Sequence, residues 1–151
     1  MLAEVRSQMD QLESLFRLAS SQNDLQVQAR LTEYLCVRVA GFVEQSARHV
    51  YYNHALRRSQ PTIQRFVSTQ LDRPQNLVSE RLGQLVQSFA PQWKTDFDLF
   101  LTDERKSALN SVYGNRDRIA HGLGVSLGIA QLKAWYEKVV EIVEFLDAQA
   151  A

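Results

Sequence analysis

The chain has 151 residues and carries 17 basic and 17 acidic side chains, so its formal net charge is zero. Zero net charge excludes a strong overall field that would draw the molecule to nucleic acid or to an anionic membrane, and any contact with RNA must depend on a local patch. The single cysteine, Cys36, excludes an intrachain disulfide and a cysteine-rich zinc site. A chain of this length can bury a hydrophobic core that is stable without disulfide bonds or bound metals, and we expect residues 1–151 to form a single domain.

No segment has the pattern of a secretory signal or of a membrane span. Residues 1–20 mix charged and apolar side chains where a signal peptide would have a continuous apolar region. The longest apolar runs are far shorter than the roughly 20 residues that cross a bilayer. We therefore expect a soluble cytoplasmic protein with no membrane contact.

Apolar residues recur at steps of three and four along the chain, which is typical of amphipathic helices. The pattern predicts helices over residues 2–19, 25–54, 61–69, 77–89 and 127–148, and one that begins at Thr102 and ends before Gly114. The segment Pro91–Leu101 is predicted to be an aromatic-rich connector that closes one end of the core. Strand-like alternation is absent, so we predict an all-α bundle of about five to six helices.

Local features refine this prediction. The residues Ser20–Asp24 are expected to cap and turn the chain, and Ser126 is expected to cap the last helix. In the helix over residues 61–69, the apolar side is predicted to consist of Ile63, Phe66 and Val67. Cys36 is predicted to be a small buried residue, with a catalytic thiol as the alternative.

The segment from Arg48 to Arg81 contains six arginines and only two acidic residues, and aromatic side chains lie near its start. Two interpretations stay open. The cations can belong to a solvated helix end, where they complement the helix dipole, or they can form a surface that contacts phosphates.

The segment Tyr113–Gly122 concentrates more reactive side chains than any other part of the chain. Arg116 and His121 are five residues apart, which separates them by about 140° around a helix, so they must converge on a groove at a helix end or on a partner surface. Asp117 and His121 are four apart and share a face, where the carboxylate can accept the imidazole N–H. Asn115 is predicted to cap a short helix that contains them.

These groups suit the cleavage of RNA without a metal. The reaction needs a base for the ribose 2′-hydroxyl, an acid for the leaving 5′-oxygen and a cation for the charge on phosphorus. Histidine serves either proton-transfer role, and the planar fork of arginine matches phosphate oxygens. Because one histidine cannot be base and acid at once, a two-fold dimer that brings together two copies of Arg116 and His121 belongs to this hypothesis.

The same residues resemble the signature of the HEPN superfamily, small all-α domains named for higher eukaryotes and prokaryotes nucleotide binding. That signature is Arg-x4-6-His with a polar residue after the arginine, here Arg116 to His121 followed by Gly122. An acidic residue with a basic one four positions later is a second family feature, and Glu44 and Arg48 match it. The segment Leu35–Glu44 is similar to the second helix of the HEPN group found beside ribonuclease-like effectors in bacterial conflict systems.

The resemblance implies a metal-independent endoribonuclease that needs no cofactor and acts on RNA as a homodimer. Such proteins serve in toxin–antitoxin or antiphage systems, under the control of an antitoxin or another partner protein. Carried over to this sequence, the catalytic residues are Arg116 and His121, with Asp117 orienting or modulating them. The residues expected to bind RNA or line the cleft are Glu44, Arg48, Asn115 and Arg118.

Other interpretations stay open beside this one. His121 can be a helix-end residue that only satisfies a local carbonyl. The whole chain can be a catalytically inactive regulatory or dimerisation module that binds a nucleotide or a protein, or a scaffold member of a larger complex. No metal site is predicted, since His49 and His54 are five residues apart and not the four that place two imidazoles on one helix face.

Overall fold

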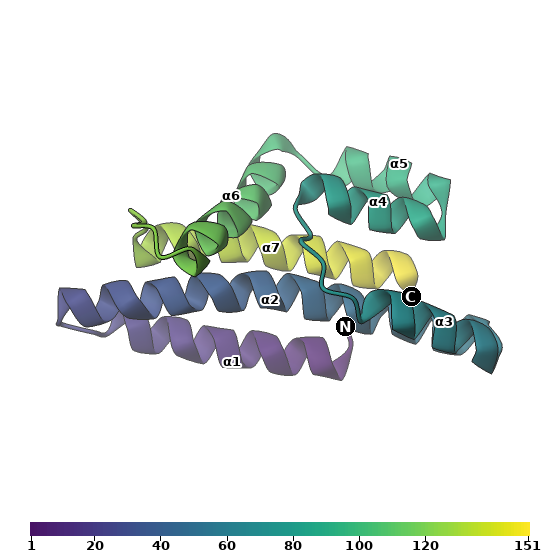
Figure 1. Ribbon diagram of the computed structural model, residues 1–151, viewed down its shortest axis with the longest axis horizontal. Helices are drawn as coiled ribbons and strands as arrows, with labels where there is room; N and C mark the ends of the chain where they lie inside the picture. The colour runs from purple at the N-terminus through teal and green to yellow at the C-terminus, as the bar shows by residue number, and fades with distance from the viewer.

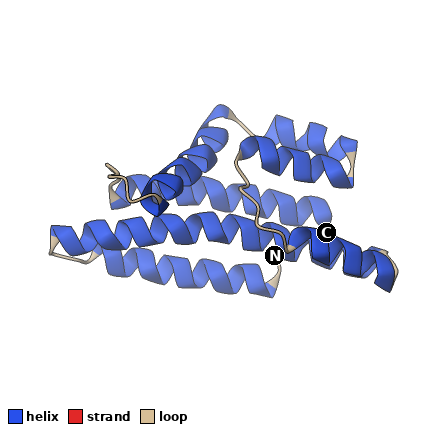
Figure 2. Cartoon of the chain, in the orientation of Figure 1, coloured by secondary structure: helices blue, strands red, loops and turns tan.

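The computed structural model describes residues 1–151 and consists of seven α-helices joined by short connections, with no strand (Figure 1, Figure 2). This confirms the all-α prediction. The helices are α1 (Ala3–Ser20), α2 (Leu25–Arg58), α3 (Pro61–Leu71), α4 (Ser79–Phe89), α5 (Pro91–Phe100), α6 (Asp103–Ala120) and α7 (Ile129–Ala150).

The helix count exceeds the prediction because Pro91–Phe100 is a helix and not a connector. Pro91 occupies the first turn, where its missing N–H costs no hydrogen bond. Trp93, Phe97 and Phe100 follow at steps of four and three, so they lie on one side of α5, and Phe97 is fully buried. The aromatic side chains do close part of the core, but as one face of a helix.

Helix α2 is the centre of the bundle. It has 34 residues and a length of about 51 Å at 1.5 Å per residue, and it packs against α1, α3, α6 and α7. Figure 1 shows α1, α2 and α7 lying side by side, with α6 running obliquely across α2 and α7 and the α4–α5 pair above α7. Every helix contributes to one continuous cluster of buried apolar side chains.

Two helix starts follow the predicted capping pattern. Asp24 accepts hydrogen bonds from the backbone N–H groups of Gln26 and Val27 at the start of α2. Thr102 accepts one from Arg105 N at the start of α6. The start of α7 differs from the prediction, because Gly128 and not Ser126 holds the N-cap position. None of the helices is long and apolar enough to cross a membrane.

Helix α3 departs from the predicted apolar side. Leu71 is buried and Val67 is half-buried, but Ile63 and Phe66 are exposed by 52% and 62%. The turn after α2 lays α3 against the last part of α2 through Val67 and Leu71. Two of the three predicted core-facing side chains therefore point away from the bundle.

The stability of the motif helix depends on its buried face. Leu109 of α6 is fully buried in the core cluster, so we expect Leu109→Ala to lower the free energy of unfolding by about 2–5 kcal/mol through lost burial and a residual cavity. Leu99→Ala is the matched control, because Leu99 is 80% exposed and its truncation should change stability by less than about 0.5 kcal/mol. Urea denaturation followed by circular dichroism measures both. Equal effects of the two substitutions would contradict the buried packing of α6.

Candidate functional site

The Arg-x4-His residues lie in the last turns of α6. The helix continues without a break from Asp103 to Ala120, so Asn115 is not an N-cap as predicted. Its side-chain Nδ2 instead donates to the carbonyl of Ser111, one turn earlier, at 2.8 Å. Gly114 does not interrupt the helix because the packed faces of α6, including Tyr113, hold the backbone in place on both sides of it.

The glycine after the histidine ends α6. Gly122 has a φ of 70°, in the left-handed region that side chains disfavour. Its N–H donates to Ile119 O at 3.1 Å, and Leu123 N donates to Arg118 O at 2.8 Å. This pair of hydrogen bonds is the Schellman arrangement, and it fixes His121 at the C-cap position, where the residue is exposed.

The chain beyond the glycine is fastened to the helix by Arg118. Its Nε and one terminal nitrogen donate to the carbonyl of Gly124 at 3.1 Å and 2.8 Å. Arg118 was predicted to bind RNA or line a cleft, and in this arrangement its fork is directed at the backbone that follows His121. The side chain itself is exposed, so one edge of the guanidinium still faces solvent.

Arg116 has the opposite environment. Its side chain is only 25% exposed, and its guanidinium donates to three acceptors: Glu44 Oε1 at 3.2 Å, Asn76 Oδ1 at 3.3 Å and Asp117 Oδ1 at 3.1 and 3.3 Å. Glu44 comes from α2 and Asn76 from the α3–α4 connection. The arginine therefore ties α6 to two other segments of the fold, with its permanent charge offset by two carboxylates.

Tyr113 lies one turn before Arg116 and supports the same group. The guanidinium carbon is 4.8 Å from the centre of its ring, a cation–π distance. The hydroxyl donates to Ala40 O at 3.3 Å and to Glu44 Oε1 at 3.4 Å. Burial, and secondly the charge of Glu44, raise the pKa of this phenol far above its ordinary value, so it stays a hydrogen-bond donor to the carboxylate.

The expected hydrogen bond between Asp117 and His121 is not formed. The Asp117 carboxylate accepts from Arg116 instead, because the charged fork of the adjacent arginine is a strong donor. The His121 ring makes no hydrogen bond at all, so it does not satisfy a local carbonyl either. Arg116 is thus held on the inner side of the helix end, and His121 is free on the outside.

Glu44 and Arg48 lie one turn apart on α2 and both line a small hollow of about 20 Å³ against the α3–α4 connection. Arg48 does not contact Arg116. Its Nε donates to Leu71 O at 3.3 Å and lies 3.6 Å from the Asp72 carboxylate, and its side chain is 44% exposed. Glu44 therefore belongs to the hydrogen-bond network of Arg116, whereas Arg48 lies beside this network and is not part of it.

Cys36 is fully buried, as predicted. Its Sγ donates to Val112 O at 3.5 Å. Burial raises the pKa of the thiol to about 11, and the nearby Arg116 charge only partly opposes this. A thiol that stays protonated at neutral pH is a poor nucleophile, so Cys36 serves the packing between α2 and α6.

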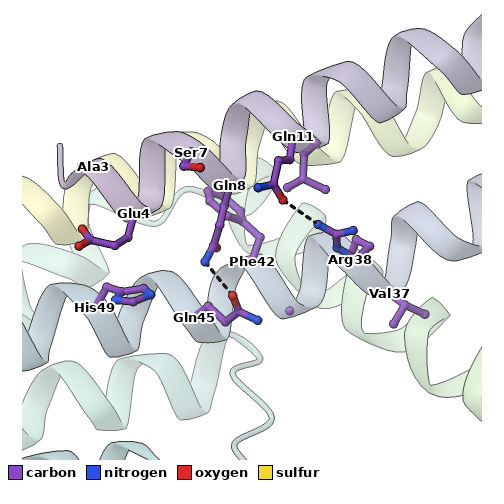
Figure 3. Close-up of a pocket in the computed structure, with 12 residues that line it drawn as sticks. Ala3, Glu4, Ser7, Gln8, Gln11, Val37, Arg38, Phe42, Gln45 and His49 are labelled. Carbon is purple, nitrogen blue, oxygen red and sulfur yellow. Dashed lines mark hydrogen bonds between the residues drawn. The ribbon is translucent and has the colours of Figure 1, made fainter.

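A larger groove of about 780 Å³ lies between α1 and α2 (Figure 3). Figure 3 shows it bridged by a hydrogen bond from Gln8 to Gln45 and by another from Arg38 to Gln11. No residue from Tyr113 to Gly122 lines it. The groove is thus separate from the motif, on the α1 side of α2.

The basic segment has a partly structural role. Arg57 and His54 both contact the carbonyl of Ala150 at the end of α7, and Arg58 donates to Ala151 O. Arg57 and Arg58 thus complement the end of α7, and Arg57 also donates to Asn53 O in the last turns of its own helix. The arginines without a hydrogen-bond or ion-pair partner in this segment are Arg65, Arg73 and Arg81, all exposed.

Two residues of the site were not assigned a role from the sequence. Tyr113 could have been found, because a residue three positions before Arg116 lies beside it on a helix. Asn76 could not, because it lies 40 positions away in a connection without a motif. Only the packing of the α3–α4 connection against α6 brings it to the arginine.

An all-α bundle whose penultimate helix ends in Arg-x4-His-Gly agrees with the resemblance to HEPN domains. The model of the RiboL-PSP-HEPN family matches residues 3–151, and the chain belongs to this family. Searches of the curated proteins and of the solved structures found no match.

The left-handed glycine gives a test of the helix end. Gly122→Ala should lower the free energy of unfolding by about 1 kcal/mol or more, because alanine disfavours a φ of 70° even though its Cβ would meet open space. Gly124→Ala is the matched control, since that glycine also lies in open space and lacks a left-handed φ. Chemical denaturation compares the two. If both variants are equally stable, the Schellman arrangement does not hold His121 in place.

Proposed function

We propose that this protein is a metal-independent endoribonuclease in which Arg116 and His121 act on the scissile phosphate. The observation that carries the proposal is the contrast between these two side chains on α6: Arg116 is held in a fixed position by Glu44, Asn76 and Asp117, and His121 is exposed and unbonded five residues later. Membership of a HEPN family supports the same assignment.

The reaction assigned to these residues is attack of the ribose 2′-oxygen on the adjacent phosphorus. The 2′-hydroxyl loses its proton to a neutral imidazole, the bond to the 5′-oxygen breaks, and an imidazolium returns a proton to that oxygen. The products are a 2′,3′-cyclic phosphate and a free 5′-hydroxyl. The guanidinium of Arg116 offsets the charge that grows on the phosphoryl oxygens.

Asp117 has a defined part in this scheme. Its Oδ1 accepts from Nε and from a terminal nitrogen of Arg116, and this edge of the fork is the one that a phosphate would use. At 49% exposure the carboxylate is free to leave, whereas Glu44 is 27% exposed and also accepts from Tyr113. An incoming phosphate therefore displaces Asp117, which can then accept the imidazole N–H of His121 one turn away.

The proposal requires two copies of the chain. One imidazole cannot be base and acid in the same turnover, and the chain has no second histidine near α6. A two-fold dimer with the ends of both α6 helices on one cleft supplies the second histidine. The proposed substrate is RNA, and the cellular role in keeping with the family resemblance is that of a toxin or antiphage effector with a controlling partner protein.

One observation favours a second candidate, a catalytically inactive dimerisation or regulatory module. The fork of Arg116 is already bound to protein acceptors on both of its edges. A side chain with this set of contacts can serve purely as a strut between α6, α2 and the α3–α4 connection. The two candidates differ in the role of His121, which transfers protons in the nuclease and is only a surface residue in the regulatory module.

Cleavage of a labelled mixed RNA pool in EDTA tests the activity. We expect the wild type to cut RNA in the presence of the chelator and to leave 2′,3′-cyclic phosphate ends, and we expect His121→Ala to reduce the rate by about 100-fold or more because proton transfer is lost. His49→Ala is the control, since His49 lines the separate α1–α2 groove.

Helicity and sedimentation of each variant are measured in parallel, so that a loss of folding or of dimerisation is not mistaken for a loss of chemistry. Intact RNA from a folded, dimeric wild-type sample would replace the nuclease with the regulatory module.

The exchange of partners at Arg116 gives a separate kinetic signature. Asp117→Asn should lower KM, because phosphate no longer competes with a carboxylate for the fork, and should also lower kcat, because the freed carboxylate no longer orients His121. Arg116→Lys should lose about tenfold or more in kcat/KM, since an ammonium cannot reproduce the fork.

Arg17→Lys on α1 is the control for a simple change of cation. An Asp117→Asn variant with unchanged KM and kcat would show that this carboxylate neither occupies the phosphate position nor orients the imidazole.

A further inference from the structure

Helix α3 presents an apolar surface that nothing in the chain covers. Its inner side packs on α2 through Val67 and Leu71, while Ile63 and Phe66, one turn apart, are 52% and 62% exposed. We call the outer side of α3, defined by Ile63 and Phe66, the α3 face. Leu56 at the end of α2 is a further exposed apolar side chain at this end of the molecule, at 43%. Apolar side chains gathered on one exposed helix are typical of an interaction site.

The sequence segment that contains the α3 face has basic side chains and no acidic ones. The chain as a whole has equal numbers of acidic and basic residues, but residues 45–71 contain no aspartate or glutamate. Of the arginines in this segment, Arg57 and Arg58 donate to backbone carbonyls at the end of α7, and the side chain of Arg65 on α3 has no hydrogen-bond or ion-pair partner. The first acid that follows, Asp72, is paired with Arg48. An apolar stripe with an unpaired arginine and no acidic side chain in the same segment favours a partner that is apolar and negative.

The α3 face is also far from the end of the motif helix. Figure 1 shows α3 at the right-hand end of the bundle, where it lies beside the last part of α2, and the connection that follows His121 at the opposite end. The α3 face is therefore not a continuation of the surface around His121, and an RNA bound at His121 does not explain it.

We propose that the α3 face binds an acidic amphipathic helix of a protein partner. Ile63 and Phe66 form a ridge at the three-residue spacing that helices use to pack against each other, and α3, with 11 residues, is about 16 Å long. The partner then contributes about three helical turns, with apolar side chains against the ridge and carboxylates toward Arg65.

RNA and membrane fit this surface less well. Base stacking uses aromatic rings, and the α3 face has one ring, Phe66, beside an aliphatic side chain. A helix that lies in a membrane surface needs a broad apolar side, and the only exposed large apolar residues among the 11 residues of α3 are Ile63 and Phe66.

The proposal does not depend on the nuclease assignment, because it uses no residue of the Arg116 network.

A peptide probe tests the chemistry of this surface. The probe is a labelled helical peptide of about 16 residues, long enough to hold a helix, with leucines at positions i, i+3, i+4 and i+7 and glutamates on its other faces. Matched probes carry lysines in place of the glutamates, or the same residues in scrambled order. Fluorescence anisotropy with the full chain measures binding. We expect the acidic probe to bind with a Kd on the order of 10 µM, as suits a small interface, and less tightly as salt rises.

Variants locate the binding. Phe66→Ser should weaken binding of the acidic probe at least tenfold, and Arg65→Gln about threefold. Leu99→Ser, which removes a still more exposed apolar side chain on α5, should leave binding unchanged. Since all three side chains are exposed, circular dichroism should show the same helicity in each variant.

Several results would overturn the proposal. These are equal binding of the acidic and basic probes, insensitivity to Phe66→Ser, or no binding of the acidic probe. It also fails if Phe66→Ser abolishes binding of a single-stranded RNA oligonucleotide or of anionic phosphatidylserine vesicles, or if it abolishes self-association in sedimentation. Loss of RNA cleavage in His121→Ala has no bearing on any of these readouts.

Discussion

The interaction on which the site depends is the contact of the Arg116 guanidinium with Glu44 and Asn76. An arginine does not lose its proton, so a charged side chain that is only 25% exposed needs acceptors from the surrounding protein. Helix α2 supplies one, and the α3–α4 connection supplies another. Removing Glu44 takes away the less exposed of the two carboxylates that balance this permanent charge, which costs more than the contact itself contributes. The position of α6 on the bundle is thereby fixed at the point where the motif begins.

The other half of the motif is held by the backbone and not by side chains. The left-handed Gly122 and the hydrogen bond from Leu123 to Arg118 stop the helix directly after His121. The imidazole is therefore fixed only at its Cα and is free beyond it. A rigid cation beside a free acid–base group is useful where the cation must meet a phosphate in a set orientation, while the histidine must reach atoms on either side of it.

The sequence predicted most of the helices, because burial on one face imposes a three-and-four spacing that can be read directly, as in α7. The prediction is wrong where this spacing cannot be recognised in the sequence. The prediction of a connector around Phe97 is wrong, because the proline and the aromatic residues there belong to a helix too short to show a long apolar pattern. Asn115 was taken for a cap because glycine precedes it, although packing carries α6 through. The residues of the Arg-x4-His motif can be named from the sequence, but their contacts cannot. Competition between donors decides whether Asp117 binds Arg116 or His121, and tertiary packing alone brings Asn76 to the arginine.

A short connection joins α3 to the residues that contact Arg116. Helix α3 ends at Leu71, Asp72 then pairs with Arg48, and Asn76 reaches Arg116 only five residues after the end of the helix. A partner bound at the α3 face would contact the helix from which this connection starts, and Asn76 in the connection is one of the acceptors that orient the guanidinium. Coupling between the two surfaces then requires that the connection have two arrangements, one with Asn76 on Arg116 and one without. With Asn76 withdrawn, Glu44 and Asp117 would still balance the charge of Arg116, so the second arrangement leaves no buried cation unpaired. Its energetic cost is then the loss of one hydrogen bond to a charged group, about 1.5–3 kcal/mol.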